Sequence, residues 1–163
     1  MAKIVKFYKV ELKNGFLSNW YLSDFIIDGI KFNSAEQYIM WRKAMLFYDI
    51  NTADKILKEK KPSRMKNYGR EIEGFIEEEW NVIRKKVTLK ACLEKFKQNE
   101  ELKEKLLEFD VNSIFVNCNP YEKVWGIGLR PDDPRTYYKS RWKGKNLLGD
   151  CLSRVRKELE NDR

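Results

Sequence analysis

The sequence predicts an α+β fold, a mainly helical single domain around a small β-sheet. Residues 4–10 and 113–119 are short runs rich in β-branched and aromatic side chains, as in strands. Residues 25–32 contain Asp28-Gly29, a pair typical of the two-residue turn in a β-hairpin. Residues 73–97 repeat apolar side chains at the spacing of a long helix. The order strand, hairpin, several helices, strand and helix indicates a sheet embedded among helices.

Length and composition favour one domain covering residues 1–163. The chain has 163 residues, of which 42% are hydrophobic and 13% aromatic, enough for one packed core. No apolar run reaches the roughly 18 residues that a membrane span needs, so we expect no membrane partner. The N-terminal residues alternate like a strand and lack the apolar centre of a signal peptide, which predicts a cytoplasmic protein.

The helices follow from caps, breaks and apolar spacing. Ser34 and Gln37 form a capping box that begins a helix reaching Phe47. Pro62 separates two short helices, and Trp80 lies on the apolar face of the long one. The expected helices cover residues 34–47, 52–58, 63–70, 73–97, 101–108 and 147–160, and a glycine-rich loop covers 120–146.

Residue content excludes several kinds of chemistry. The chain has no histidine, which excludes Ser-His-Asp and Cys-His catalysis and histidine-bound metals. Its three cysteines form no CxxC pair, which argues against a zinc site or a disulfide framework. We therefore expect no metal and no cofactor. The net charge of +8 suits nucleic acid, a phosphorylated small molecule, or simply a lysine-rich surface in which lysine alternates with glutamate.

The helix at 34–47 carries Glu36 and Lys43 among apolar side chains that point to nearly every side. A helix of this kind is enclosed, and enclosed charges are costly unless they are paired or line a cavity. The two residues are two turns apart, roughly 10 Å along the axis, which suits opposite ends of a small-molecule pocket. The alternative is that Glu36 stabilises the first helical turn while Lys43 extends to solvent.

Three other stretches offer binding residues. Asn19 and Trp20 precede the hairpin, where a polar turn and a core tryptophan are the alternative. Trp125 offers a flat face for a base, and Gly126 and Gly128 would let a ligand approach the backbone, although a tight turn explains them too. Asn146 begins a helix whose amides could hold a phosphate, or it is a simple N-cap.

Two carboxylates are candidates for catalysis. Hydrolysis of a glycosidic bond passes through an oxocarbenium-like transition state, which one carboxylate stabilises while a second acid protonates the leaving group. Glu36 and Glu122 are the candidates, and Glu122 lies three residues before Trp125.

Several elements in a fixed order carry a family resemblance. They are Phe16–Trp20, the Asp-Gly hairpin, Ser34–Tyr38 with Lys43-Ala44, Met65–Arg70, Trp80, Lys95-Phe96, Glu122–Leu129, Gly144–Gly149 and Val155-Arg156. Together they resemble the NADAR (NAD and ADP-ribose) family of YbiA-like N-glycosidases over nearly the whole chain. The family often has aspartate at Glu122, glutamate at Asn117 and histidine at Gln37. Asn117 cannot act as an acid or a base.

The resemblance implies a YbiA-like fold and hydrolysis of N-glycosidic bonds in ribosides. It implies an acid role for Glu36, with Lys43, Trp80, Trp125 and the nearby glycines beside the substrate. The expected substrate is a phosphoribosylamino-pyrimidine intermediate of riboflavin biosynthesis, which would release ribose 5-phosphate. Alternatives are removal of ADP-ribose from guanine in nucleic acid and a non-catalytic ADP-ribose sensor, which Asn117 in place of an acid would suit. A plain nucleic-acid-binding protein is a further alternative, marked by steep salt dependence.

Overall fold

The computed structural model describes residues 3–163, and these residues form two compact units. Unit 1 combines the N-terminal residues up to Ser18 with Glu100–Arg163, and unit 2 is the continuous stretch Asn19–Asn99. Helices predominate in both, and each has one small sheet, which confirms the predicted α+β class. The prediction that residues 1–163 form a single domain stays a prediction.

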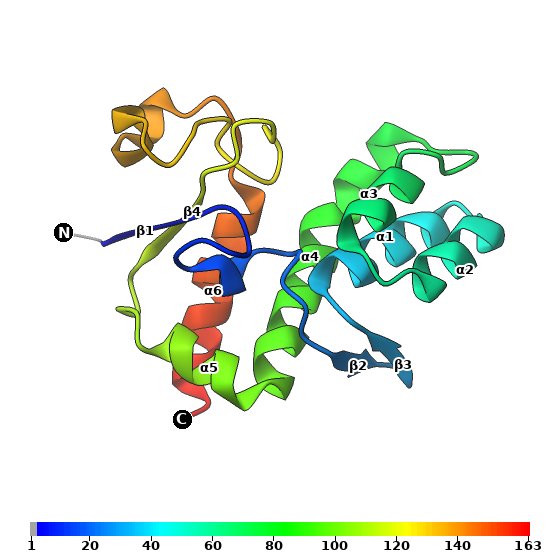
Figure 1. The fold of residues 1–163 in the computed structure, drawn as a ribbon, viewed down its shortest axis with the longest axis horizontal. Helices are drawn as coiled ribbons and strands as arrows, with labels where there is room; N and C mark the ends of the chain where they lie inside the picture. Colours follow the sequence, from blue (N-terminus) through cyan, green and yellow to red (C-terminus); the bar gives the residue numbers. More distant parts are fainter. Residues whose placement is uncertain (1–2) are drawn as a thin grey trace. The chain divides into compact units, whose positions relative to one another are not determined.

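Unit 2 is built around an enclosed helix. Its elements are β2 (Phe25–Ile27), β3 (Ile30–Phe32), α1 (Ala35–Leu46), α2 (Ile50–Lys58), α3 (Pro62–Gly69) and α4 (Glu77–Gln98). Helix α1 packs against α2, α3 and α4, as Figure 1 shows. These neighbours explain why α1 has apolar side chains on nearly every side, and they confirm that it is enclosed.

The beginning of α1 follows the predicted capping box on the Ser34 side, while the Gln37 side chain bonds one residue before the N-cap. The hydroxyl of Ser34 accepts a hydrogen bond from the Gln37 amide at 3.2 Å. The Gln37 side-chain carbonyl in turn accepts from the Asn33 amide at 2.7 Å. The Gln37 side-chain amide donates to the Ile56 carbonyl at 2.9 Å, near the end of α2. Gln37 is therefore a structural residue that joins two helices.

The hairpin preceding α1 forms as predicted. Asp28 and Gly29 occupy its turn with φ angles of 51° and 79°, both in the left-handed region that type I′ turns require. Phe25 and Phe32 are cross-strand partners, and their ring centroids lie 5.9 Å apart. This aromatic pair stabilises the two short strands.

Helices α2, α3 and α4 begin at residues suited to a helix N-terminus. The Asp49 carboxylate accepts from the Thr52 amide at 3.1 Å and caps α2. Pro62 is the first residue of α3, where its missing N–H costs nothing. Helix α4 opens on Glu77, Glu78 and Glu79, whose charges complement the helix dipole. It begins four residues later than predicted.

Unit 1 joins two distant parts of the chain in one sheet. Its elements are β1 (Ile4–Phe7), the 3-10 helix η1 (Gly15–Leu17), α5 (Glu100–Leu107), β4 (Ile114–Asn117), the 3-10 helices η2 (Pro134–Tyr137) and η3 (Lys139–Arg141), and α6 (Leu147–Asn161). β1 and β4 are parallel, with Ile4 opposite Ile114 and Phe7 opposite Asn117. Helix α6 packs on β4, and α5 packs on α6 (Figure 1). β1 is shorter than the predicted strand, and the predicted loop contains η2 and η3.

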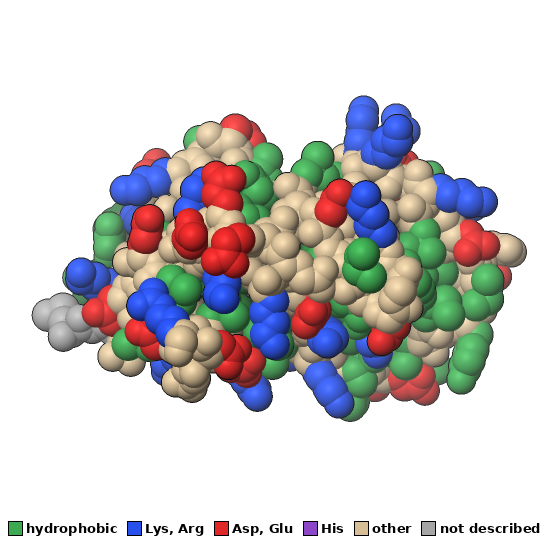
Figure 2. All heavy atoms as spheres, turned by 90° about the horizontal axis from the view of Figure 1, so that it is seen from below, with side chains coloured by type: hydrophobic (Ala, Val, Ile, Leu, Met, Phe, Trp, Pro, Cys, Tyr) green, Lys and Arg blue, Asp and Glu red, His purple; other side chains and the backbone are tan. Residues whose placement is uncertain are grey.

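Charged side chains of both signs are mixed on the surface. In Figure 2, lysine and arginine alternate with aspartate and glutamate over the face shown. This pattern agrees with the alternation of lysine and glutamate in the sequence. Within residues 3–163, no helix is both long enough and apolar enough to span a bilayer.

Candidate active site

The predicted site residues fall into two groups, one in each unit. Asn19, Trp20, Glu36, Lys43 and Trp80 belong to unit 2. The other six belong to unit 1, and they are Asn117, Glu122, Trp125, Gly126, Gly128 and Asn146. The structure shows what each group does within its own unit, and the functional role of each residue stays a prediction.

Glu36 is a buried carboxylate at the start of α1. Its side chain lies in the first helical turn, and the residue is only 8% exposed. The Glu36 amide donates to the Asn19 carbonyl at 3.0 Å, which fixes Asn19 beside this turn. The positive end of the helix dipole stabilises a carboxylate there. Burial nevertheless opposes the negative charge of an ionised Glu36.

Lys43 lies two turns further along α1 and is half-buried. Its ammonium donates to the Gly69 carbonyl at 2.8 Å and lies 4.7 Å from the centre of the Phe75 ring. Burial lowers the pKa of Lys43, the charge of Glu36 raises it, and the charge of Arg70 lowers it further. Glu36, Lys43 and Arg70 therefore share one electrostatic environment within unit 2.

Gly69 allows the approach that brings its carbonyl to Lys43. A Cβ at this position would overlap the Met40 sulfur on α1. A larger residue would therefore require the flexible Met40 side chain to move. The element Met65–Arg70 thus supplies both the carbonyl that holds Lys43 and the cation Arg70.

Two aromatic residues accompany these charges. Trp20 is 39% exposed, and the Lys66 ammonium lies 6.0 Å from the centre of its ring. Phe75 is 41% exposed and pairs with Phe47, with ring centroids 5.3 Å apart. Trp80 is 6% exposed, so its ring packs in the protein interior. An exposed ring beside a cation is what an aromatic base with a phosphate requires.

Lys66, Arg70 and Phe75 were absent from the predicted site residues. The first two lie in the Met65–Arg70 element, which the sequence does single out, but their charges give no indication of where they point. Phe75 follows Gly74, whose φ of 75° turns the chain just before α4. An aromatic residue directly after such a glycine is the only sequence feature that could have indicated it.

A shallow hollow lies just beyond the end of α1. Its volume is about 360 Å³, and its lining is Phe47, Tyr48, Asp49, Ile50, Asn51, Glu73 and Gly74. The size is within the range of small-molecule pockets. Two of its lining residues, Asp49 and Glu73, are acidic, so the hollow does not suit a phosphate.

In unit 1, the Asn146 side chain completes the hydrogen bonding of β4. Its amide nitrogen donates to the Phe115 carbonyl at 2.9 Å. Its carbonyl oxygen accepts from the Asn117 amide at 3.0 Å. The residue is 1% exposed and has a φ of 55°. Its polar side-chain atoms are thus used by the backbone of a neighbouring strand.

The glycine loop wraps around the end of β4. The Ile127 amide donates to the Asn117 carbonyl at 3.0 Å, and the Asn117 side chain donates to the Trp125 carbonyl at 3.3 Å. A Cβ on Gly126 would lie 2.9 Å from the Asn117 carbonyl oxygen. Gly128 has a φ of 68°, which side-chain-bearing residues rarely adopt. These two glycines therefore have structural reasons to be glycine.

The start of α6 has little free capacity for a phosphate. The Leu147 amide donates to the Val124 carbonyl at 3.1 Å, and the Leu148 amide donates to the Trp125 carbonyl at 3.2 Å. These are the first two amides of the helix, the groups that an anion would need. Glu122 and Trp125 are both half-buried in the same loop. Among residues 3–163, no cluster of cysteine, aspartate and glutamate has the arrangement of a metal site.

Known proteins resemble this chain in sequence and in structure. The protein irg-1 of Caenorhabditis elegans is 41% identical over 133 residues, which are 80% of this chain and 62% of that protein. N-glycosidase R617 of Acanthamoeba polyphaga mimivirus is 37% identical over 125 residues, 77% of this chain and 73% of that protein. This chain therefore spans less than two thirds of irg-1 and nearly three quarters of R617.

A solved structure and a family model agree with these relatives. The NMR structure of the Escherichia coli protein YbiA superposes with a TM-score of 0.80, at 26% identity, over 99% of this chain and 88% of that chain. The family model of the NADAR domain matches residues 6–160, which is nearly the whole sequence. The chain therefore belongs to the NADAR domain family.

Proposed function

We propose that this protein is an N-glycosidase, a hydrolase that cleaves the bond between C1′ of a ribose and the nitrogen of a base or amine. One observation carries the proposal: the carboxylate of Glu36 is buried at the start of an enclosed helix, near enough to Lys43 for its charge to act on that ammonium. The names of its relatives support it, because R617 and the E. coli protein YbiA are both named N-glycosidases.

Glu36 acts on the carbon at which the bond breaks. As the C1′–N bond lengthens, positive charge develops on C1′ and the ring oxygen, and a carboxylate beside them stabilises that charge. A water molecule adds its oxygen to C1′, and Glu36 accepts one of the water's protons. The departing nitrogen takes up a proton, so the products are a free ribose and an amine. Glu122 is our candidate for the acid that protonates the nitrogen.

The cations of unit 2 bind the anionic part of the substrate. Lys43 is held by the Gly69 carbonyl, and it retains further donors on its ammonium for ribose or phosphate oxygens. Arg70 lies at the end of α3 with its side chain exposed, where a guanidinium can take a phosphate in a bidentate manner. Lys66 beside Trp20 offers a second combination of cation and ring.

The substrate we propose is a phosphoribosylamino-pyrimidine intermediate of riboflavin biosynthesis, from which hydrolysis releases ribose 5-phosphate. A compact phosphorylated riboside suits a site with one buried carboxylate and a few cations. Two alternatives use the same residues. One is hydrolysis of ADP-ribose from guanine in nucleic acid, and the other is binding of ADP-ribose without turnover.

A direct assay separates these possibilities. The protein is incubated with the phosphoribosylamino-pyrimidine, with an oligonucleotide carrying ADP-ribosylated guanine, and with ADP-ribose alone. Ribose 5-phosphate and free ADP-ribose are then quantified by mass spectrometry, with Glu36→Gln as the matched inactive variant. We expect ribose 5-phosphate from the first substrate with the wild type only.

Each other outcome has a definite meaning. Release of ADP-ribose from the oligonucleotide would establish the first alternative. Binding of ADP-ribose with no product from either substrate would indicate the sensor. Equal product from the wild type and Glu36→Gln would refute the proposed role of the carboxylate.

A further inference from the structure

Residues 135–145 of unit 1 are an unusual concentration of positive charge. They contain five cationic residues and no acidic residue, namely Arg135, Lys139, Arg141, Lys143 and Lys145. Unit 1 as a whole has 17 lysine and arginine residues against 13 aspartate and glutamate residues. Without residues 135–145 those numbers would be 12 and 13, so this segment holds the whole positive excess of its unit.

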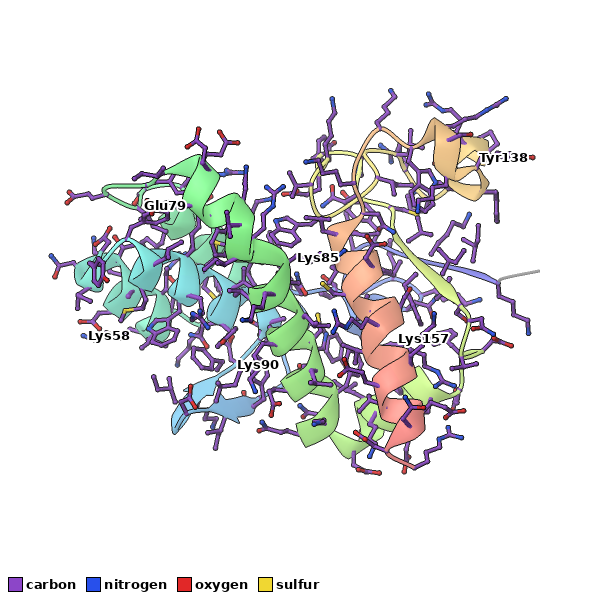
Figure 3. The ribbon with its side chains drawn as sticks, turned by 180° about the vertical axis from the view of Figure 1, so that it is seen from behind. Lys58, Glu79, Lys85, Lys90, Tyr138 and Lys157 are labelled. Carbon is purple, nitrogen blue, oxygen red and sulfur yellow. The ribbon has the colours of Figure 1, made fainter. Side chains whose placement is uncertain are left out.

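Two exposed tyrosines lie within the same segment. Tyr137 is 55% exposed and Tyr138 is 58% exposed. Figure 3 shows Tyr138 at the outer edge of the η2–η3 region, pointing away from the ribbon. The Lys6 ammonium lies 4.5 Å from the centre of the Tyr137 ring, and the Arg141 guanidinium lies 5.4 Å from that of Tyr138. Each ring therefore has a cation beside it.

Contacts within unit 1 hold residues 135–145 in place. The Trp142 indole donates to the Thr136 carbonyl at 2.9 Å, and Thr136 is fully buried. Trp142 also packs against the buried cluster of Val116, Cys118, Ile127 and Leu129. These contacts before and after the tyrosines fix the backbone, so the rings are presented with little loss of entropy on binding.

Three cations of the segment are available to a ligand, whereas the Lys6 ammonium already donates to the Pro131 carbonyl at 2.8 Å. The Asp133 carboxylate forms an ion pair with the Arg135 guanidinium at 2.7 Å. The Asp132 carboxylate lies 4.0 Å from the guanidinium of Arg130. Lys139, Arg141 and Lys145 are exposed, and among residues 3–163 none of the three is in an ion pair. Lys123 is exposed as well, and its carbonyl accepts from the Lys145 amide at 2.8 Å, which places these two lysines side by side.

We propose that residues 135–145, together with Lys123, form a binding surface for single-stranded nucleic acid. Bases stack on Tyr137 and Tyr138, and phosphates pair with Lys139, Arg141 and Lys145. Stacking needs unpaired bases, which favours a single strand over a duplex. An acidic peptide would use the cations but not the rings. A membrane surface would need exposed aliphatic side chains, which the sequence of this segment lacks. The surface is independent of the proposed hydrolysis.

Binding of unmodified oligonucleotides tests this surface without any catalysis. Fluorescence anisotropy measures the dissociation constants of labelled 15-residue oligothymidylate and oligouridylate at several salt concentrations. The aromatic variant is Tyr137→Ala with Tyr138→Ala, and Tyr137→Phe with Tyr138→Phe is its conservative counterpart. The charge variant is Lys139→Gln with Arg141→Gln. The controls are Tyr48→Ala and the pair Lys58→Gln with Lys157→Gln, which are residues elsewhere on the chain.

We expect the aromatic variant to weaken binding roughly 10-fold or more at every salt concentration, with the phenylalanine variant close to the wild type. The charge variant should lower the slope of log affinity against log salt by about 2, one for each phosphate that the variant no longer neutralises. The controls should stay near the wild type. Circular dichroism confirms that each variant is folded.

Three results would overturn the proposal. The first is no measurable binding of either oligonucleotide at low salt. The second is an equal decrease of affinity in the charge variant and the lysine control, which would mean that only net charge matters. The third is binding of polyglutamate, or of vesicles containing anionic lipid, as tightly as the oligonucleotides with the same dependence on both tyrosines.

Discussion

The two groups of candidate residues differ in the kind of polar side chain that they bury. In unit 2, charged side chains lie inside a helical unit, as Glu36 and Lys43 do on α1. In unit 1, the buried polar residues Asn117 and Asn146 are neutral, and backbone groups satisfy them. Neutral amides with matched partners stabilise a fold at small cost, whereas buried charges cost stability unless a ligand or an opposite charge compensates.

The contrast indicates where function should be sought first. The unit 2 group places two ionisable side chains, Glu36 and Lys43, on one enclosed helix. In the unit 1 group, the side chains of Asn117 and Asn146 are already hydrogen-bonded to the backbone. We therefore expect substitutions in the first group to affect activity most and those in the second to affect stability most.

The largest expected effect is the loss of hydrolysis in Glu36→Gln. Removal of the negative charge takes away both the stabilisation of the ribosyl cation and the acceptor for the water proton, so kcat should fall about 10²-fold or more. Its free energy of unfolding should change little, because glutamine has nearly the same shape. Steady-state kinetics and urea denaturation measure the two quantities.

Glu122→Gln is the matched variant in unit 1. A comparable loss of kcat would make Glu122 the second catalytic group and would place chemistry in both units. Activity close to that of the wild type would restrict the essential carboxylate to unit 2.

Asn146→Ala should produce the largest loss of stability. It removes two hydrogen bonds to β4 and leaves the Asn117 amide and the Phe115 carbonyl without those partners inside the protein. The expected decrease in the free energy of unfolding is about 2–4 kcal/mol. Urea denaturation measures it, and Asn161→Ala, at the exposed end of α6, should stay within about 0.5 kcal/mol of the wild type. A loss of activity at unchanged stability would contradict the structural role.

Trp125→Ala tests whether the glycine loop touches the substrate. If the half-buried indole stacks on a base, substrate binding should weaken by about 1–3 kcal/mol. The measurement is the dissociation constant of an unreactive substrate analogue by calorimetry. Unchanged affinity with reduced stability would assign Trp125 to the packing of unit 1 and would strengthen the contrast between the units.

The smallest expected effect is a pH-dependent change in stability that arises from Lys95 on α4. The residue is 1% exposed, and burial lowers its pKa to about 8, with the nearby Cys92 acting in the opposite direction. Its pKa in the unfolded chain is higher, so the unfolded state binds more protons between these values and stability rises with pH there. Between pH 7 and pH 9 the gain attributable to Lys95 should be about 1 kcal/mol.

The test compares the wild type with Lys95→Met at both pH values. Burial raises the pKa of Cys92 and of Cys118 to about 11, and those thiols lower stability above their ordinary pKa near 9. The difference between the two proteins largely cancels that contribution. The wild type should gain on the variant as the pH rises, and a constant difference would contradict the lowered pKa of Lys95.

The sequence predicted the helices well because caps and breaks are local. Ser34, Asp28-Gly29 and Pro62 each act on neighbouring residues, and the structure follows all three. The pairing of β1 with β4 depends on residues more than 100 positions apart, and no local pattern specifies it. For the same reason the sequence could not show that there would be two separate small sheets.

The site was predicted unevenly for a related reason. The charges on α1 were conspicuous, because a glutamate and a lysine on an apolar helix contradict its pattern. Arg70 and Phe75 were not, because an exposed arginine and an exposed phenylalanine are ordinary in a sequence. In the other direction, the sequence did not indicate that both polar groups of the Asn146 side chain bind to β4, and its role in ligand binding stays a prediction.

The interruption of unit 1 by unit 2 has a consequence for synthesis on the ribosome. Unit 2 is one unbroken stretch of chain, so its helices can assemble as soon as residue 99 has left the exit tunnel. The strand at residues 4–7 must wait for its neighbour at 114–117, with the whole of the other unit made in between. During that interval the nascent polypeptide carries an unpaired strand. Unit 1 can assemble only after the C-terminal third of the chain has been translated.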